Sequence, residues 1–311
     1  MTSGRPIATG LHLAPDAAWL ALCSPLFDLV DVFSVTPETT WRGSDLHPND
    51  FAAAFAAIVR GREHAADGGS HPGAPQASAA GVIGHGVGFS LASEDAEFRQ
   101  SRWLPLLARD QGTFGFRWYT EHLGLTVAAG DDLQIPLPVP LTSVTAARVR
   151  RSLDRLAGVF GTVGAENSAW VVHPGAPLDE PAWLSDALGD HHLLLDLHNL
   201  YASSVNLGFD PESWLARAPL DRVIEIHLAG GDDAPARWFP RAQAPRRRIR
   251  LDSHDHDVPR EVWALFDAVW RACPNLRCVT LERQEGTVQP GDVPLLAETL
   301  VRVRETVAEA P

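Results

Sequence analysis

The chain has 311 residues, of which 45% are hydrophobic, and its formal net charge at pH 7 is −13. The length suits one α/β barrel with a sizeable core, and the charge argues against nonspecific binding to nucleic acid or to an anionic membrane. Three cysteines with no CxxC spacing, no visible signal peptide and no apolar run near the roughly 20 residues of a spanning helix favour a cytoplasmic protein without disulfides.

Eight short apolar runs with a strand-like composition recur along the chain, and helical patterns separate them. The predicted strands are 8–13, 29–35, 81–90, 116–123, 161–167, 192–198, 222–228 and 277–283. The predicted helices are 15–23, 49–61, 93–110, 143–161, 180–189, 211–218, 259–274 and 293–310. Strands that alternate with helices predict a parallel sheet, and eight such units predict a (β/α)8 TIM barrel. We expect one domain over residues 1–311, because the strand count needs both halves.

Two segments interrupt this alternation. Residues 62–80 are rich in Gly, Ala, Ser and Pro and are expected to form a flexible surface loop, which leaves His64 and His71 exposed to solvent. Residues 230–250 follow the seventh predicted strand. Because loops after the strands of a barrel form its active-site face, this long segment is expected to be an active-site loop that can act as a lid.

Side chains that can bind metals follow the carboxyl ends of consecutive predicted strands. Positions 122, 166, 196, 227, 252 and 282 are separated by 44, 30, 31, 25 and 30 residues. A βαβ unit takes about 30 residues or more, so each step advances about one strand and the side chains converge on one face. The predicted ligands are His85, His122, Glu166, Asp196, Asn199, His227, Asp252, His254 and Glu282.

The chemistry of this set favours hard or borderline divalent cations. More than four carboxylates and imidazoles without a thiolate suit octahedral iron or manganese before zinc, and carboxylates can bridge two ions. Single members have simpler interpretations: Asp196 could cap the next helix, and Glu282 could pair with Arg283. The set as a whole favours a metal site holding two or three ions, because a buried carboxylate without a partner is costly.

Several neighbouring residues stay open or are set aside. His198 shares the face of Asp196 if the strand is regular to its end, and His173 lies in a loop where it could face the site or turn away. Glu121 is expected to point out of the barrel, because neighbours on a strand face opposite ways. The segment GHGVG at 84–88 lacks the Gly-Lys-Ser/Thr end of a phosphate-binding loop.

The motifs HGVGFSL, TEHL, EN, DLHNLYASSVNLGFDP, HLAGG, DSHDHDV and LER occur in this order over residues 81–283. This series resembles the multinuclear non-haem iron-dependent oxidases, whose best-known members act in methanobactin biosynthesis and in peptidyl-cysteine β-carbon excision. The resemblance implies an enzyme with two or three iron ions in mixed Fe2+/Fe3+ valence and with O2 as co-substrate. It also implies a ribosomally made precursor peptide as substrate, modified at Cys or, less often, Asp or Asn, and a separate partner protein that captures the leader peptide.

The resemblance further implies three iron positions, with Glu166 as a bridge between the first two and a more labile third. Their implied ligands are, in turn, His85, His122 and Glu166; Glu166, Asp196, His227 and Glu282; and Asn199, Asp252 and His254. The residues expected to be central to catalysis are Asp196, His227, Glu166 and His254. Three features depart from the family pattern. The segment DVFSVTPETTW at 31–41 is a loose match with fewer carboxylates than members often carry, His198 stands where many members have Asn, and residues 231–250 match no family motif.

Two other functions compete with this one. The first is a non-redox isomerase or hydrolase on a xylose-isomerase-like barrel with a divalent metal. An isomerase of that kind usually needs a catalytic lysine, and this sequence contains no lysine. A nuclease would need a basic groove, which the charge of −13 disfavours. The second is a metal-binding scaffold without activity, which would be expected to have lost ligands.

Overall fold

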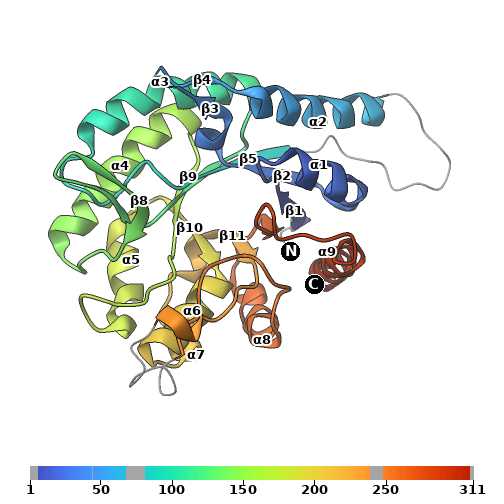
Figure 1. Cartoon of the computed structure of the whole chain (residues 1–311). Helices are drawn as coiled ribbons and strands as arrows, with labels where there is room; N and C mark the ends of the chain where they lie inside the picture. The colour runs from blue at the N-terminus through green and yellow to red at the C-terminus, as the bar shows by residue number, and fades with distance from the viewer. Residues whose placement is uncertain (1–5, 44, 68–80, 239–247, 309–311) are drawn as a thin grey trace.

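Eight parallel strands close into a barrel in the computed structural model, which describes residues 6–43, 45–67, 81–238 and 248–308, and helices lie outside it (Figure 1). Around the barrel the strands follow the order β1-β12-β11-β10-β9-β6-β5-β2. Their bounds are β1 Ala8–His12, β2 Val32–Val35, β5 Gly81–Gly86, β6 Tyr119–His122, β9 Val163–Glu166, β10 His192–Asp196, β11 Val223–Leu228 and β12 Cys278–Leu281. The predicted (β/α)8 fold is confirmed, and all eight predicted strands are present.

The helices follow the predicted positions with one addition. Their bounds are α1 Ala17–Cys23, α2 Asp50–Asp67, α3 Glu97–Phe114, α4 Ser143–Phe160, α5 Glu180–Leu188, α6 Leu197–Leu207, α7 Pro211–Leu215, α8 Arg260–Val269 and α9 Val293–Ala308. The short 3-10 segments are η1 Ser24–Leu29, η2 Pro37–Thr40, η3 Pro177–Asp179, η4 Leu220–Arg222, η5 Ala236–Trp238 and η6 Trp270–Ala272. Among the described helices, none is long and apolar enough to cross a membrane.

The strand predicted at 192–198 was too long by two residues, and α6 was missed. Leu193 and Leu195 are fully buried in the large core cluster, as both faces of a barrel strand are covered. The strand ends at Asp196 because this side chain accepts the backbone N–H of Asn199 and caps α6. Gly208, at a φ of 75° in the left-handed region, ends α6.

Two hairpins beside the barrel were also missed. The first pairs β3 Trp41–Arg42 with β4 His47–Pro48, and the second pairs β7 Leu125–Ala128 with β8 Asp131–Leu137. The second hairpin directly follows β6, so it lies at the carboxyl end of the barrel. Such short extra strands are not required by the barrel alternation, and the helix–strand pattern alone did not indicate them.

The two interrupting segments lie only partly within the described residues. Helix α2 runs on to Asp67, so the beginning of the loop predicted at 62–80 is helical instead. His71 and the side chain of His64 lie outside the described residues, as do residues 239–247 of the predicted lid. The described ends of that lid meet at Asp233, whose carboxylate lies 2.7 Å from Arg248 Nε and 3.5 Å from Arg250 NH1. The assignment of residues 1–311 to one domain stays a prediction.

Candidate metal centre

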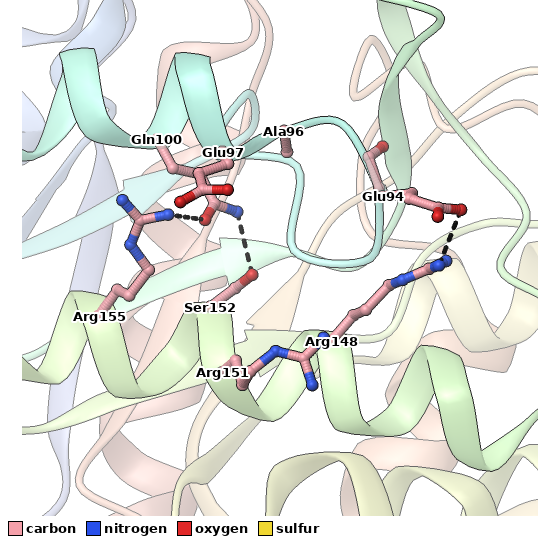
Figure 2. Close-up of a pocket in the computed structure, with 9 residues that line it drawn as sticks. Glu94, Ala96, Glu97, Gln100, Arg148, Arg151, Ser152 and Arg155 are labelled. Atoms are coloured by element: carbon pink, nitrogen blue, oxygen red, sulfur yellow. Dashed lines mark hydrogen bonds and ion pairs between the residues drawn. The ribbon is translucent and has the colours of Figure 1, made fainter.

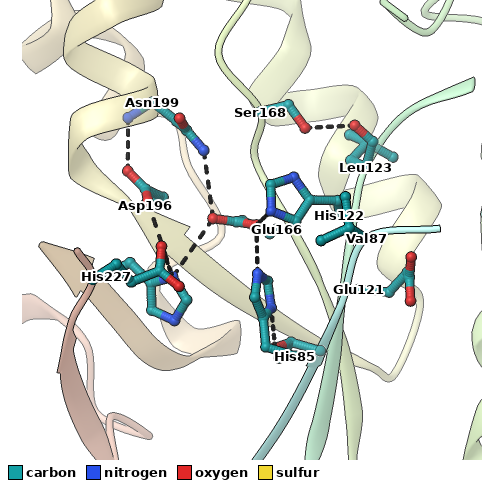
Figure 3. A network of polar contacts seen from close by, with 12 residues as sticks. His85, Val87, Glu121, His122, Leu123, Glu166, Ser168, Asp196, Asn199 and His227 are labelled. Atoms are coloured by element: carbon teal, nitrogen blue, oxygen red, sulfur yellow. Dashed lines mark hydrogen bonds and ion pairs between the residues drawn. The ribbon is translucent and has the colours of Figure 1, made fainter. Parts of the chain in front are cut away.

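Six strands that are consecutive around the barrel, from β5 to β12, place a histidine or a carboxylate at their carboxyl ends. The ladder aligns His122 with Glu166 on β6 and β9, and Asp196 with His227 on β10 and β11. His85 lies near the end of β5, and Glu282 directly follows β12. Because the strands are parallel and in this register, the side chains meet inside the mouth of the barrel, and Figure 3 shows five of them, His85, His122, Glu166, Asp196 and His227.

The first group consists of His85, His122 and Glu166. Glu166 Oε2 lies 2.7 Å from His122 Nε2 and 3.3 Å from His85 Nε2. The other ring nitrogen of His85, Nδ1, lies 3.0 Å from Thr120 Oγ1, which fixes the orientation of the ring. Their potential ligand atoms lie within 4.8 Å of one another, so one ion could contact all three side chains.

The second group surrounds His227 Nδ1. This atom lies 3.2 Å from Glu282 Oε2, 3.7 Å from Glu166 Oε1 and 4.0 Å from Asp196 Oδ2. All four side chains are at most 5% exposed. Glu166 directs one oxygen to each group, which is the arrangement of a bridging carboxylate.

The third group lies on the open side of the cluster and contains His198, Asp252 and His254. Asp252 Oδ1 lies 2.6 Å from His254 Nε2 and 3.3 Å from His198 Nδ1. His254 Nδ1 lies 3.5 Å from Glu282 Oε2, so Glu282 joins the second and third groups. The Asp252 side chain is 24% exposed, and His254 has a φ of 47°, an unusual backbone conformation for a residue other than glycine.

Eight buried polar atoms in these groups and in the neighbouring Asn199 make no hydrogen bond within the described part of the chain, although some of them lie in the ion-pair contacts given above. Buried polar atoms are normally satisfied, so their concentration here requires an explanation. Histidine nitrogens and carboxylate oxygens, without a thiolate among them, match the donors of a divalent metal. The residues present therefore fit a metal centre. The atoms are His85 Nε2, His122 Nδ1, Glu166 Oε2, Asp196 Oδ2, His198 Nε2, Asn199 Oδ1, His227 Nδ1 and His254 Nε2.

The pKa values of the histidines and carboxylates in the cluster depend strongly on one another. Burial opposes the charged form of His122, but Glu166 outweighs it and raises the pKa of His122 to about 9. Burial opposes ionisation of Glu166, but His122 and His85 lower its pKa to about 2. Burial, followed by repulsion from Glu166 and Asp252, raises the pKa of Asp196 well above its usual range. Protonated histidines thus offset the carboxylate charge, a role that a divalent cation can take over.

Asn199 does not lie with Asp252 and His254, the pair with which the resemblance grouped it. Its Nδ2 atom donates to the Asn167 carbonyl at 3.1 Å and lies 3.4 Å from Glu166 Oε1. His198 takes the place beside Asp252, because α6 begins at Leu197 and turns the side chains that follow Asp196. The assignment of the nine predicted ligands stays a prediction, and His198 joins them as a candidate.

His12 is a cluster residue that the sequence analysis did not single out. It ends β1, next to β12, and its Nδ1 lies 3.7 Å from Glu282 Oε1 and 3.2 Å from Ser34 Oγ. Burial lowers the pKa of His12 to about 4, even though Glu282 opposes this shift. Its position at a strand end, like that of the other ligands, was an available signal in ATGLH.

Two residues left aside in the sequence lie outside the cluster. His173 Nε2 lies 4.0 Å from Glu180 Oε1, in a separate buried site next to Trp170 and Trp214. Glu121 points away from the cluster, as expected, but it is fully buried and not exposed (Figure 3).

The glycine segment after β5 is held by two carboxylates. Glu38 Oε1 accepts the backbone N–H groups of Val87 at 2.6 Å and Gly88 at 2.9 Å, and Glu121 Oε1 accepts that of Phe89 at 2.9 Å. These N–H groups are therefore not available to a phosphate, and the segment positions the strand end that carries His85.

A cavity of about 440 Å³ lies elsewhere, between the start of α3 and the outer surface of α4 (Figure 2). Arg148 pairs with Glu94 at 2.8 Å, and Gln100 connects Ser152 and Arg155 through hydrogen bonds of 2.9 and 2.8 Å. Partners within the chain thus satisfy these side chains, and the cavity is separate from the metal-binding cluster.

The sequence profile described as RiPP precursor modification enzyme MbnB/TglH/ChrH matches residues 64–306, which is most of the chain. RiPP denotes a ribosomally synthesised and post-translationally modified peptide. A UPF0276 protein of Caulobacter vibrioides is 34% identical over 59% of this chain and 62% of its own length. UPF0276 protein BPP1075 of Bordetella parapertussis is 33% identical over 69% of this chain and 72% of its own. The chain thus spans less than two thirds of the first of these relatives.

Solved structures support the fold at low sequence identity. A xylose isomerase domain containing protein from Salmonella typhimurium has a TM-score of 0.57 at 12% identity and covers 98% of this chain and 100% of its own. Endonuclease IV from Thermus thermophilus has a TM-score of 0.54 at 16% identity, covering 95% and 99%. The chain therefore has a xylose-isomerase-like TIM barrel, and at this identity the likeness concerns the fold alone.

Proposed function

The chain belongs to the family of RiPP precursor modification enzymes described as MbnB/TglH/ChrH, and on that premise we propose that it is an iron-dependent, O2-using oxidase of a precursor peptide. The observation that carries the proposal is the set of buried imidazole and carboxylate atoms at the mouth of the barrel that make no hydrogen bond with the residues the structure describes. Their overlapping groups offer positions for two or three ions. Cys is the proposed target residue, with Asp and Asn as further candidates.

The donor set favours iron over the alternatives. Carboxylates and imidazoles without thiolates suit iron and manganese, and bridging carboxylates suit adjacent ions of different valence. Iron bound in such a centre supplies one-electron chemistry with O2 and deprotonates a coordinating substrate thiol. Glu166 and Glu282 would hold neighbouring ions at a fixed spacing, because each directs oxygen atoms to histidines of two groups.

The three groups suggest different tasks. The first two are enclosed, with carboxylates at most 5% exposed, so they exclude water from the centre. The third is reached from solvent through Asp252, which makes it the side from which a peptide would enter. His254, joined to Glu282, would couple the entry side to the enclosed groups. The proposed catalytic residues remain Asp196, His227, Glu166 and His254.

The partner and compartment are part of the same proposal. The substrate is a ribosomally made precursor peptide, and a separate protein captures its leader segment. The protein is placed in the cytoplasm, in line with three cysteines that are all free and buried.

A non-redox, divalent-metal isomerase or hydrolase is the second candidate, because imidazole and carboxylate donors also suit zinc and manganese. The sequence has no lysine to serve such an isomerase beside the metal. Metal identity separates the two functions directly.

The deciding experiment is anaerobic purification followed by metal counting and Mössbauer spectroscopy. We expect at least two irons per chain and a mixed-valence signal after partial oxidation. Alanine at His227 should remove both iron and O2 consumption. Zinc or manganese in place of iron, with fewer than two irons per chain, would rule out the oxidase.

A further inference from the structure

Glu225 is a carboxylate enclosed in the barrel, and the roles proposed above do not use it. It lies on β11 two residues before His227, so both side chains face the barrel interior. Its side chain is 0% exposed. A charge buried this deeply is tolerated only where hydrogen bonds satisfy it.

Three donors from different parts of the barrel satisfy Glu225. Its Oε2 accepts from Trp118 Nε1 at 2.8 Å, and Trp118 directly precedes β6 on the other side of the barrel. Its Oε1 accepts from Thr280 Oγ1 on β12 at 2.6 Å, and the same oxygen lies 3.0 Å from His227 Nε2. The carboxylate is therefore fixed before any metal binds.

This contact determines how His227 presents its ring. An ionised carboxylate only accepts hydrogen bonds, so His227 Nε2 carries the hydrogen and Nδ1 of the neutral ring keeps a lone pair. Nδ1 makes no hydrogen bond with any residue that the structure describes, and it faces Glu282 Oε2 at 3.2 Å and Glu166 Oε1 at 3.7 Å. We propose that Glu225 is the positioning residue that makes Nδ1 of His227 the metal ligand, an inference that rests on the metal centre proposed above.

Trp118 gives the test its specificity, because an indole N–H only donates. In Glu225→Gln the amide has one oxygen and one NH2 group. If the oxygen stays on Trp118, the NH2 group faces His227 Nε2 and moves the ring hydrogen to Nδ1, where it blocks the metal. If the amide oxygen faces His227 instead, the NH2 group lies against the indole N–H of Trp118, and two hydrogen-bond donors face each other without an acceptor. In the double variant Glu225→Gln/Trp118→Phe the indole N–H is gone, and the amide oxygen is free to turn to His227.

The experiment measures Fe(II) and Zn(II) binding by anaerobic titration of wild type, E225Q, W118F and E225Q/W118F, with thermal unfolding to check folding. We expect E225Q to lose metal affinity about 10- to 100-fold, as is typical for carboxylates that orient a metal-bound histidine. W118F should bind like wild type, and the double variant should regain most of the lost affinity. If the substitutions acted only by damaging the structure, the double variant would lose at least as much metal affinity as E225Q.

Glu180 provides the matched control. It is also a buried carboxylate that accepts indole N–H groups, from Trp170 at 2.8 Å and Trp214 at 3.0 Å, but it lies outside the cluster. E180Q should leave metal affinity unchanged. Wild-type affinity in E225Q, or a double variant no better than E225Q, overturns the role of Glu225 alone. Zinc binding without iron overturns the oxidase alone, and binding of neither metal overturns both proposals.

Discussion

Asp196 Oδ1 accepts the backbone N–H of Asn199 at 2.6 Å, whereas Asp196 Oδ2 makes no hydrogen bond within the described ranges and faces the cluster, 4.0 Å from His227 Nδ1. One carboxylate thus caps α6 and offers a metal donor. The two interpretations that competed for Asp196 in the sequence, a helix cap and a ligand, describe its two oxygen atoms. Because the roles belong to different atoms, substitutions can separate them.

Asp196→Asn should keep the cap and weaken the metal site. Asparagine caps helices as well as aspartate, whereas alanine loses about 1 kcal/mol at this position. Burial and neighbouring carboxylates raise the pKa of Asp196, so removing its charge relieves repulsion in the metal-free protein. We expect metal-free D196N to unfold at or above the wild-type temperature, D196A to unfold below it, and both to bind iron weakly. Equal unfolding temperatures for both variants would contradict the cap.

His198→Ala should remove one ion and leave the other two positions occupied. His198 lies against Asp252 in the open group, whereas Asn199 lies against Glu166 in the enclosed part of the cluster. If the three positions fill, H198A should lose about one metal per chain in anaerobic metal counts. Asn199→Ala is the matched comparison, and it should not selectively empty the open position. The reverse pattern would restore Asn199 to the third set of ligands.

Metal uptake should release protons and strengthen as pH rises. Burial opposes the charged forms of His122 and His254, but Glu166 and Asp252 raise their pKa values to about 9 and about 10. Both rings are therefore protonated at pH 7 without metal and must lose a proton to bind it. We expect at least two protons released per fully loaded chain, measured by titration in buffers of different ionisation enthalpy. Release of none would show that these histidines are not ligands.

The metal-free protein should show the matching stability profile. The raised pKa of His122 contributes stability below its unfolded value of 6.5, which is lost as pH rises through about 9. The lowered pKa of Glu166 contributes stability above its unfolded value of 4.5, which is lost as pH falls through about 2. His122→Gln should flatten the alkaline decline in the unfolding temperature of the metal-free protein. An unchanged decline would assign it to other groups.

Glu38→Ala should destabilise the segment after β5. Glu38 Oε1 is the acceptor for the part-buried backbone N–H groups of Val87 and Gly88, and the loss of such a hydrogen bond costs about 1 kcal/mol. We expect a lower urea midpoint in E38A and recovery in E38Q, which keeps an acceptor oxygen. Glu97→Ala, at an exposed position on α3, serves as the control. E38A with the wild-type midpoint would mean that water replaces the carboxylate.

The sequence predicted the barrel and most of the cluster for one physical reason. Strands that are buried on both faces consist mostly of apolar residues. A polar residue at the end of such a strand therefore indicates the open carboxyl end of the barrel. The directions of the side chains after Asp196 could not be predicted, because they depend on the local backbone conformation. The helix that begins at Leu197 turns His198 toward Asp252 and Asn199 toward Glu166, and the hydrophobic pattern of the sequence did not indicate this helix. His12 ends a strand, as other cluster residues do, whereas Glu225 contacts Trp118 and His227 only in the closed barrel.

The strand register has a consequence for how the centre is built. Neighbouring strands lie about 4.8 Å apart, and the ladder sets His122 beside Glu166 and Asp196 beside His227. The spacing of the strands therefore sets the distance between the side chains at the mouth of the barrel. This distance is close to the separation that a bridging carboxylate can span. In the proposed metal centre, the spacing between ions would follow from the sheet, while the loops above the sheet could differ without moving the strand-end side chains. The proposed centre would then keep its geometry when the loops that surround the entry side change.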